Sequence, residues 1–171
     1  MITSLSCIVT FCVVFEAACL IQAYFHKSIG HGGWLAWIGK THRGSHHRVY
    51  SASTFEAPLY NRHEDGVEFT YIPPGIILTL LTYALLPPVL AGTSLAAVLA
   101  SFWSHNYIHK QYHLTGSWML RFAWFRRKKE IHWIHHRDYT KNFGVIDHLW
   151  DRLTGSFAGP EAHARYKRRG A

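Results

Sequence analysis

Charged residues and cysteines are scarce in this sequence, and the common motifs for nucleotides, haem and iron–sulfur clusters are missing. Only 16% of the residues are charged. The three cysteines, Cys7, Cys12 and Cys19, all lie in the first apolar segment without a CxxC spacing, so they indicate neither a disulfide framework nor a thiolate metal site. No GxGxxG, P-loop, CxxCH or iron–sulfur cysteine pattern occurs. Any redox chemistry would therefore need electrons from a separate protein.

Apolar residues are abundant and the net charge is basic. The 171 residues, which we assign to a single domain spanning 1–171, are 49% apolar and carry a formal charge of +8. A basic balance can indicate nucleic acid, but here the charges flank long apolar runs. We therefore expect a membrane surface as the partner and no nucleic acid.

The first apolar run, at about residues 3–25, is long enough to span a bilayer. It lacks the basic start and the A-x-A end of a cleaved signal peptide. Glu16 lies in the middle of the run, where a carboxylate is costly in lipid. We therefore predict a transmembrane helix on which Glu16 faces other helices, either with a functional role or as a hydrogen-bonded packing residue.

A second apolar region is interrupted by Pro87 and Pro88. Either half alone is short for a span, so the region is either one long kinked helix or a hairpin of two helices at about 73–86 and 88–108. All 18 Lys and Arg residues lie between 27 and 62 or between 110 and 169. Only the hairpin puts both basic segments on one side of the membrane, as the positive-inside rule requires. We therefore predict a multi-pass membrane protein whose histidine clusters and C-terminus face the cytoplasm.

Three further segments predict a loop, a surface helix and a basic tail. Residues 51–70 predict a loop, and residues 117–131 mix aromatic and basic groups in a way that predicts an amphipathic helix on anionic headgroups. Residues 160–171 form a basic tail, which we expect to end without fixed structure.

Histidines form four short clusters with the spacings HX4H, HX3HH, HX3H and HX2HH, which hold ten of the fourteen histidines. At about 100° per residue, His105 and His109 share one helix face, and His132, His135 and His136 span about 100° of arc, so each of these two clusters can converge on one site. His42 and His46 also pair on one face, with His47 about 100° further round. His26 and His31 would lie about 140° apart, so they must serve two metals or the helix must break near Gly30. Ten imidazoles exceed the needs of one four- to six-coordinate ion, which favours two ions.

Imidazole suits iron, zinc, copper and nickel, and a pair of irons held mainly by neutral nitrogen donors can reduce dioxygen and attack an unactivated C–H bond. A hairpin in the membrane would offer an apolar route for the alkyl chain of a lipid. Other side chains should orient the histidines by hydrogen bonds. The candidates near the last cluster are Glu130, Asp138, Asn142, Asp147 and Asp151. Each of these also fits an ordinary surface or capping role.

With these motifs, the sequence resembles the fatty acid hydroxylase and sterol desaturase superfamily of membrane-bound histidine-box diiron oxygenases. The resemblance runs from His26 to Gly155 and rests on the four clusters in order, on Asn142-Phe143-Gly144, and on the stretch from Trp150 to Gly155. The short length is similar to bacterial carotenoid hydroxylases, whereas the HX3H cluster and the Trp-Asp-Arg-Leu ending are similar to the fatty-acid and sterol branch. The subfamily, and with it the lipid, stays open.

The resemblance implies an all-α integral membrane fold, in which a transmembrane helix and a helical hairpin carry a cytoplasmic, histidine-rich helical cap. It implies two iron ions, which zinc could replace in purified protein, with O2 as co-substrate and an external electron-transfer protein. The implied reaction is hydroxylation of a membrane lipid such as a fatty acyl chain, a sterol or a carotenoid. Desaturation at the same centre is the alternative. A non-enzymatic metal- or haem-binding membrane protein is a second alternative, but it would place histidines within the spans.

Matching the clusters to the resemblance implies ten metal ligands. They are His26, His31, His42, His46, His47, His105, His109, His132, His135 and His136. His113 lies one turn past His109 but outside the cluster pattern, so it is left out, as are His63, His148 and His163.

Overall fold

The structure is a computed structural model that describes residues 3–60 and 67–168. Over these residues the chain is helical and forms no strand, which confirms the predicted all-α class. The α-helices are α1 (Ser4–Phe25), α2 (Ala36–Gly44), α3 (His46–Val49), α4 (Ile72–Leu85), α5 (Pro88–Tyr112), α6 (Ala123–Arg137), α7 (Leu149–Leu153) and α8 (Pro160–Arg168). The π-helix η1 (His26–His31) continues α1, and the 3-10 helices η2 (Val67–Tyr71) and η3 (Trp118–Arg121) precede α4 and α6.

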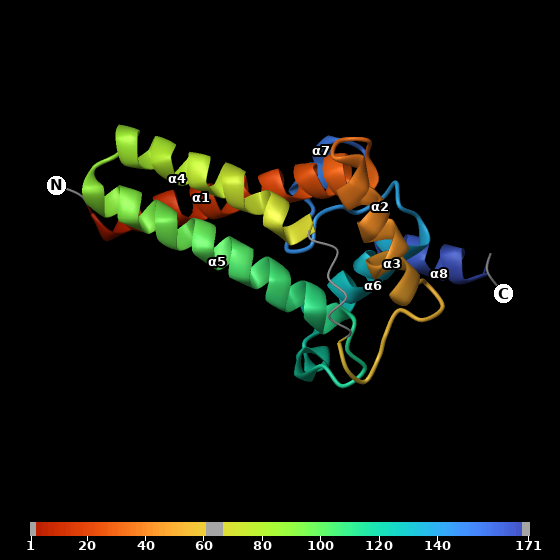
Figure 1. Ribbon diagram of the computed structural model, residues 1–171. Coiled ribbons are helices and arrows are strands. Elements are labelled where there is room, and N and C mark those ends of the chain that lie inside the picture. The colour runs from red at the N-terminus through yellow and green to blue at the C-terminus, as the bar shows by residue number, and fades with distance from the viewer. Residues whose placement is uncertain (1–2, 61–66, 169–171) are drawn as a thin grey trace.

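Helices α1, α4 and α5 form a bundle in which α1 and α4 both pack against α5 (Figure 1). Two helical segments, Ser4–His31 and Val67–Leu85, are long and apolar enough to cross a membrane. Large apolar side chains such as Ile8, Leu80 and Leu99 are exposed on the bundle, and no residue of α4 is buried. Such a surface suits lipid better than water, because exposed apolar patches of this kind are rare on soluble proteins.

Helices α4 and α5 are separated by Leu86 and Pro87 and run antiparallel (Figure 1). Leu86 is extended, with φ −116° and ψ 153°, so α4 ends there. Pro88 stands at the first position of α5, where its missing N–H costs nothing, and the Pro87 carbonyl accepts a hydrogen bond from Leu90 N at 2.9 Å. The two helices therefore form the predicted hairpin, and the single kinked helix is excluded, whereas the placement of the hairpin in a membrane stays a prediction. Helix α5 continues to Tyr112, beyond the predicted end at residue 108.

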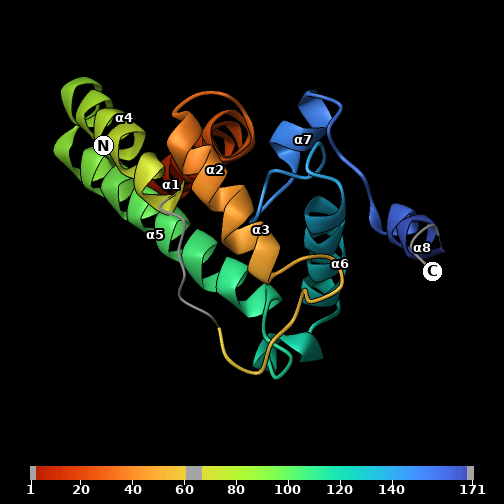
Figure 2. The same cartoon turned by 45° about the vertical axis from the view of Figure 1, so that its right-hand side comes forward.

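The remaining helices form a cap at one end of the bundle (Figure 2). Two apolar cores hold the cap to the long helices. One core is Ile29, Ile38, Val67 and Tyr71, and the other is Phe55, Tyr112, Met119, Phe125 and Val145. Because η1, the continuation of α1, and the end of α5 both enter these cores, the histidines near these helix ends are enclosed by the cap.

The basic segment after α5 differs from the prediction of one amphipathic surface helix over 117–131. The chain forms η3 and then α6, and Lys129 is buried, with Nζ 3.1 Å from a carboxylate oxygen of Glu56 and 3.0 Å from the Leu114 carbonyl. Lys128 also turns inward and donates to the Ile146 carbonyl. A buried ammonium group needs such partners, and they come from segments that a helical pattern cannot reveal.

The predicted basic tail begins with helix α8, which packs on α6. Tyr166 donates to Asp138 Oδ2 at 2.6 Å, and the rings of His163 and Trp133 lie 4.7 Å apart. Residues 169–171 of this tail, residues 61–66 of the predicted loop and His63 lie outside the described residues.

Candidate di-metal centre

Ten histidines gather inside the cap in two groups of five. In each group the candidate ligand atoms all lie within 4.8 Å of one another. The first group is His26, His31, His42, His47 and His135, and the second group is His46, His109, His113, His132 and His136. All are buried except the partly buried His31. The structure thus offers two places that could each hold one metal ion.

The first group contains both His26 and His31, which corrects the expectation that they serve two metals or flank a break near Gly30. The segment from His26 to His31 is a π-helix, whose i→i+5 bonds bring residues five apart above one another. A Cβ at Gly30 would lie 3.1 Å from His26 Cδ2 and 3.3 Å from His42 Cδ2. The widened turn therefore aligns the two rings, and the glycine leaves space for them.

The two clusters with adjacent histidines are each divided between the groups. In α6, His132 and His136 are one turn apart and enter the second group, whereas His135 lies on the other edge of the same face and enters the first. Helix α2 ends at Gly44 and α3 begins at His46, so His47 rather than His46 joins His42 in the first group. Both segments therefore connect the two candidate ions.

Four of the ten imidazoles donate their Nδ1–H to a backbone carbonyl. The pairs are His26 with Phe143 O (2.8 Å), His135 with Lys141 O (2.7 Å), His113 with Phe55 O (2.9 Å) and His136 with Tyr50 O (2.5 Å). Because a carbonyl only accepts, Nδ1 must carry the proton, and Nε2 keeps its lone pair for a metal. Metal-binding histidines are commonly oriented in this way by a hydrogen bond from the other ring nitrogen.

The distances between Nε2 atoms match two nitrogens on one ion. They are 3.1 Å for His26–His42, His42–His47 and His31–His47, and 3.2 Å for His113–His132 and His132–His136. With metal–nitrogen bonds of about 2.0–2.1 Å, octahedral or tetrahedral angles place two nitrogens roughly 2.9–3.4 Å apart. Hydrogen bonds alone do not explain the second group, because His132 Nε2 faces two unprotonated nitrogens and can carry only one proton.

Three further buried Nε2 atoms, those of His46, His109 and His135, have no hydrogen-bond partner among the described residues. Buried polar atoms without partners are rare in folded proteins, because leaving them unpaired costs free energy. A cation in each group would satisfy these lone pairs. The residues present therefore fit a di-metal centre.

Burial keeps the cap histidines neutral. It lowers the pKa of His135 to about 4 and that of His113 to about 3. Burial, followed by repulsion from neighbouring imidazoles, holds the pKa values of His46, His47 and His132 well below their usual range. At neutral pH these rings are therefore uncharged, with one N–H and one nitrogen lone pair each, which is the form that binds a metal.

The structure places nine of the ten predicted ligands in the two groups, and the exception is His105. His105 is buried, but its Nδ1 lies 3.1 Å from Gln22 Oε1, and it belongs to neither group. His113, which the sequence analysis left out, lies in the second group instead. The sequence could have indicated His113 as a ligand, because His109 and His113 have the same HX3H spacing as His105 and His109.

Two of the predicted orienting residues, Asn142 and Asp151, hold the backbone segment 141–144, whose carbonyl groups orient two of the histidines. Asn142 has a left-handed backbone (φ 56°), and its amide bonds Ile131 O at 3.1 Å and both N and O of Ala158. Asp151 accepts hydrogen bonds from the backbone N–H groups of Phe143 and Gly144. These interactions fix the segment whose carbonyls receive the Nδ1–H groups of His26 and His135.

The other predicted orienting residues make different contacts. Asp138 accepts from Tyr166 of α8, and Asp147 lies beside Glu16 of α1. Glu16 was predicted to face other helices, but it lies beside the irregular segment that precedes α7. Glu130 lines a separate cavity between α6 and α8.

Comparison with known proteins links this site to one family. The sequence model of the family described as fatty acid hydroxylase matches residues 9–156, most of the chain. The matched part includes all ten grouped histidines together with Asn142 and Asp151. No curated protein and no solved structure matches the chain.

Proposed function

Because the chain belongs to the fatty acid hydroxylase family, we propose that it is a membrane-bound oxygenase that hydroxylates a C–H bond of a lipid with O2 at a centre of two iron ions. The observation that carries the proposal is the pair of five-imidazole groups with their converging Nε2 atoms. Neutral nitrogen donors suit zinc as well as iron. Protein purified with zinc would therefore have the site without its redox chemistry.

We assign the ten grouped histidines as ligands, five to each ion. In this assignment His113 takes the place that the resemblance implies for His105. Its Nδ1–H is held by the Phe55 carbonyl, and its Nε2 points at His132, whereas His105 is held by a side chain of α1.

When bound, a pair of iron ions supplies the reductive activation of O2 and the abstraction of hydrogen from an unactivated C–H bond. In the overall reaction, R–H, O2, two electrons and two protons give R–OH and water. The protein keeps the imidazoles neutral by burial and fixes their orientation through the carbonyls of Lys141 and Phe143. Burial also separates the centre from bulk water, which strengthens electrostatic interactions there.

A lipid chain has a route to this centre. A cavity of about 400 Å³ lies between α1 and α4 over α5, and its lining is almost entirely apolar. Its volume and lining are typical of a small-molecule site. We propose that an alkyl chain enters this cavity from the bilayer and extends toward the histidines.

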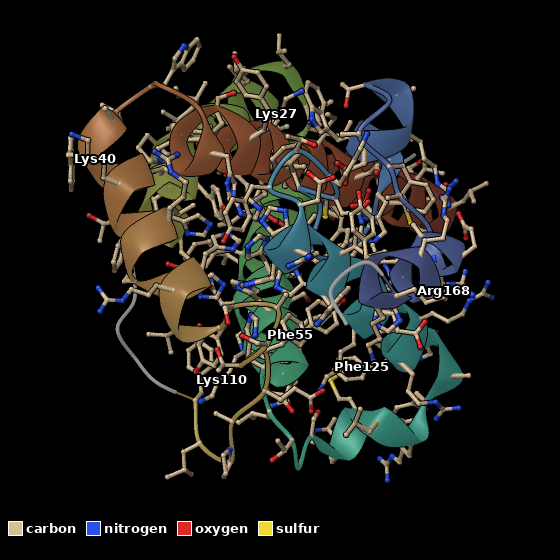
Figure 3. The ribbon with its side chains drawn as sticks, turned by 90° about the vertical axis from the view of Figure 1, so that its right-hand side faces the viewer. Lys27, Lys40, Phe55, Lys110, Phe125 and Arg168 are labelled. Atoms are coloured by element: carbon tan, nitrogen blue, oxygen red, sulfur yellow. The ribbon has the colours of Figure 1, made fainter. Side chains whose placement is uncertain are left out.

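We further propose that the cap faces the cytoplasm and receives electrons from an acidic carrier protein. Lys27, Lys40 and Arg168 lie around the outside of the cap (Figure 3), and all three are exposed. A basic surface of this kind favours encounter with an acidic partner. The partner must supply the two electrons, since the sequence contains no recognisable motif for a flavin, haem or iron–sulfur cofactor.

Desaturation remains the alternative at the same centre, since both reactions begin with hydrogen abstraction. It consumes the same O2, electrons and protons but releases two waters and leaves a double bond. Haem ligation would need two imidazoles on opposite faces of a flat macrocycle, whereas here five imidazoles converge on one point in each group. The product decides between the first two: hydroxylation adds one oxygen atom, and desaturation removes two hydrogen atoms.

The experiment that tests the proposal measures metal content and products together. Protein purified without air in detergent should contain two irons per chain without a Soret band. Cells expressing it under 18O2 should accumulate a lipid carrying one labelled oxygen. His46→Ala and His135→Ala, one from each group, should each abolish the product while the protein still inserts in the membrane. A Soret band, or a chain with intact fold and no metal, would refute the proposal.

A further inference from the structure

The apolar cavity between α1 and α4 ends at a small polar network. Its lining includes the apolar Ile21, Leu80 and Val98, and among its few polar groups are Gln22 and Ser101, both buried. Such a pocket, apolar with a few fixed polar groups, is typical of a site that positions its ligand by those groups.

The hydrogen bonds of this network determine which way the Gln22 amide points. Ser101 donates its hydroxyl hydrogen to Val98 O at 3.0 Å, so it can only accept from Gln22, whose Nε2 lies 3.3 Å from Ser101 Oγ. Gln22 Oε1 must then face His105, and His105 must donate Nδ1–H to it at 3.1 Å. The tautomer and the amide orientation follow from Val98 O, which can only accept.

One donor of this network is still available. The Gln22 amide nitrogen carries two hydrogens, and Ser101 accepts only one of them. Since Gln22 lines the cavity, the second N–H can donate to a ligand inside it. A buried donor that finds an acceptor only when ligand is bound favours ligands that carry one.

The network lies close to both histidine groups. Gln22 of α1 is four residues before His26, the first residue of η1, and His105 is four residues before His109 in α5. One turn corresponds to roughly 6 Å along a helix. If Gln22 held an oxygen atom of a lipid, the lipid carbons a few bonds from that oxygen would therefore lie close to the candidate ions.

We propose that Gln22 is a substrate-binding residue that donates a hydrogen bond to an oxygen of the lipid, and that His105 is the residue that positions the Gln22 amide. This inference rests on the proposed function, and it names the substrate class. The substrate is a long-chain lipid with a carbonyl or hydroxyl oxygen close to the oxidised carbon. A plain hydrocarbon segment would leave the donor unpaired.

The test is a binding competition that requires neither metal nor turnover. Protein in detergent is offered equal amounts of hexadecane and methyl tetradecyl ketone, and native mass spectrometry measures the ratio of the two complexes. Because of this one hydrogen bond, the ratio of ketone complex to hexadecane complex should be about three- to tenfold higher in the wild type than in Gln22→Leu. His105→Leu, which releases the amide, should reduce the preference, because the N–H is no longer aimed into the cavity.

The control is Asn106→Leu, which also replaces a side-chain amide by leucine, but at a position that lines a different cavity. This variant should keep the ketone preference of the wild type. Equal ratios in the wild type and Gln22→Leu would overturn the inference. If Gln22→Leu does not elute as a folded species, Gln22→Met, which has a similar length and no hydrogen-bond donor, replaces it with the same expected outcome.

This design separates the two proposals. A ketone preference in a protein without iron or oxidised product would leave this inference standing and refute the proposed function. Oxidised lipid with no ketone preference would overturn only the assignment of Gln22.

Discussion

Asp151→Asn should loosen the first histidine group without altering any of the ten grouped histidines. Asp151 is fully buried, and its two oxygens accept from the backbone N–H groups of Phe143 and Gly144, each at 2.9 Å, and from Ser156 Oγ at 2.7 Å. An amide has one oxygen, so its NH2 group would face a donor. Losing a hydrogen bond to a charged group and leaving a buried donor unpaired should together destabilise the fold by roughly 2–5 kcal/mol.

The same change should weaken metal binding in one group only. The Phe143 carbonyl, which orients His26 at 2.8 Å, belongs to the segment that Asp151 holds, whereas the Phe55 carbonyl orients His113 in the second group. Loss of a residue that orients a ligand typically lowers metal affinity about 10- to 100-fold. Titration with a chelator, followed by iron per chain, should therefore show that one ion leaves early. Loss of both ions together, or of neither, would refute this reasoning.

Asp138→Asn is the matched control, because Asp138 bonds Tyr166 and Thr140 rather than the Phe143 segment. The pH dependence gives a second check. Burial raises the pKa of Asp151, but hydrogen bonds from His148, Ser156 and the backbone outweigh it, so the net pKa is below the ordinary value. Such a carboxyl stabilises the fold above its unfolded pKa and loses this effect as pH falls through the folded pKa. The difference in melting temperature between the wild type and Asp151→Asn should therefore be largest at neutral pH and become small below about pH 4.

Three other predictions concern the ligand assignment, the space around Gly30 and the membrane topology. His113→Ala should remove one ion, whereas His105→Ala should leave the metal content unchanged; equal losses in the two variants would contradict the ligand assignment. Gly30→Ala should lower iron occupancy at an unchanged elution volume, since its Cβ would press on the rings of His26 and His42; full occupancy would show that the rings can move. A reporter fused to the C-terminus should give a cytoplasmic signal, and an external signal would overturn the proposed topology.

Local rules were sufficient for the parts of the fold that depend on a few neighbouring residues. Pro87 and Pro88 end one helix and begin the next, because a proline ring fits the first helical turn and cannot continue the preceding one. The spacing of His132 and His136 places both on one helix face, where the structure brings them into the same group. The division of His135 into the other group depends on α2 and α3, which come from elsewhere in the sequence.

Other parts could not be predicted, because the pattern was compatible with several outcomes. His105, His109 and His113 lie at about 0°, 40° and 80° on one helix face, so spacing alone cannot select which pair binds a metal. Partners far away in sequence make that choice: Gln22 holds His105, and Phe55 holds His113. The angle between His26 and His31 was misjudged for another reason, since it assumed 3.6 residues per turn where the chain forms a π-helix.

The division of the clusters between two groups gives the candidate ions a structural role as well as a chemical one. The first group joins the continuation of α1 to the cap, and the second joins the end of α5 to it, while α3 and α6 contribute to both. Each ion would therefore clamp the cap onto a different bundle helix, close to the inner end of the apolar cavity. Since Gln22 and His105 bridge the same two helices one turn away, the spacing between α1 and α5 there sets both the ion positions and the end of the lipid site.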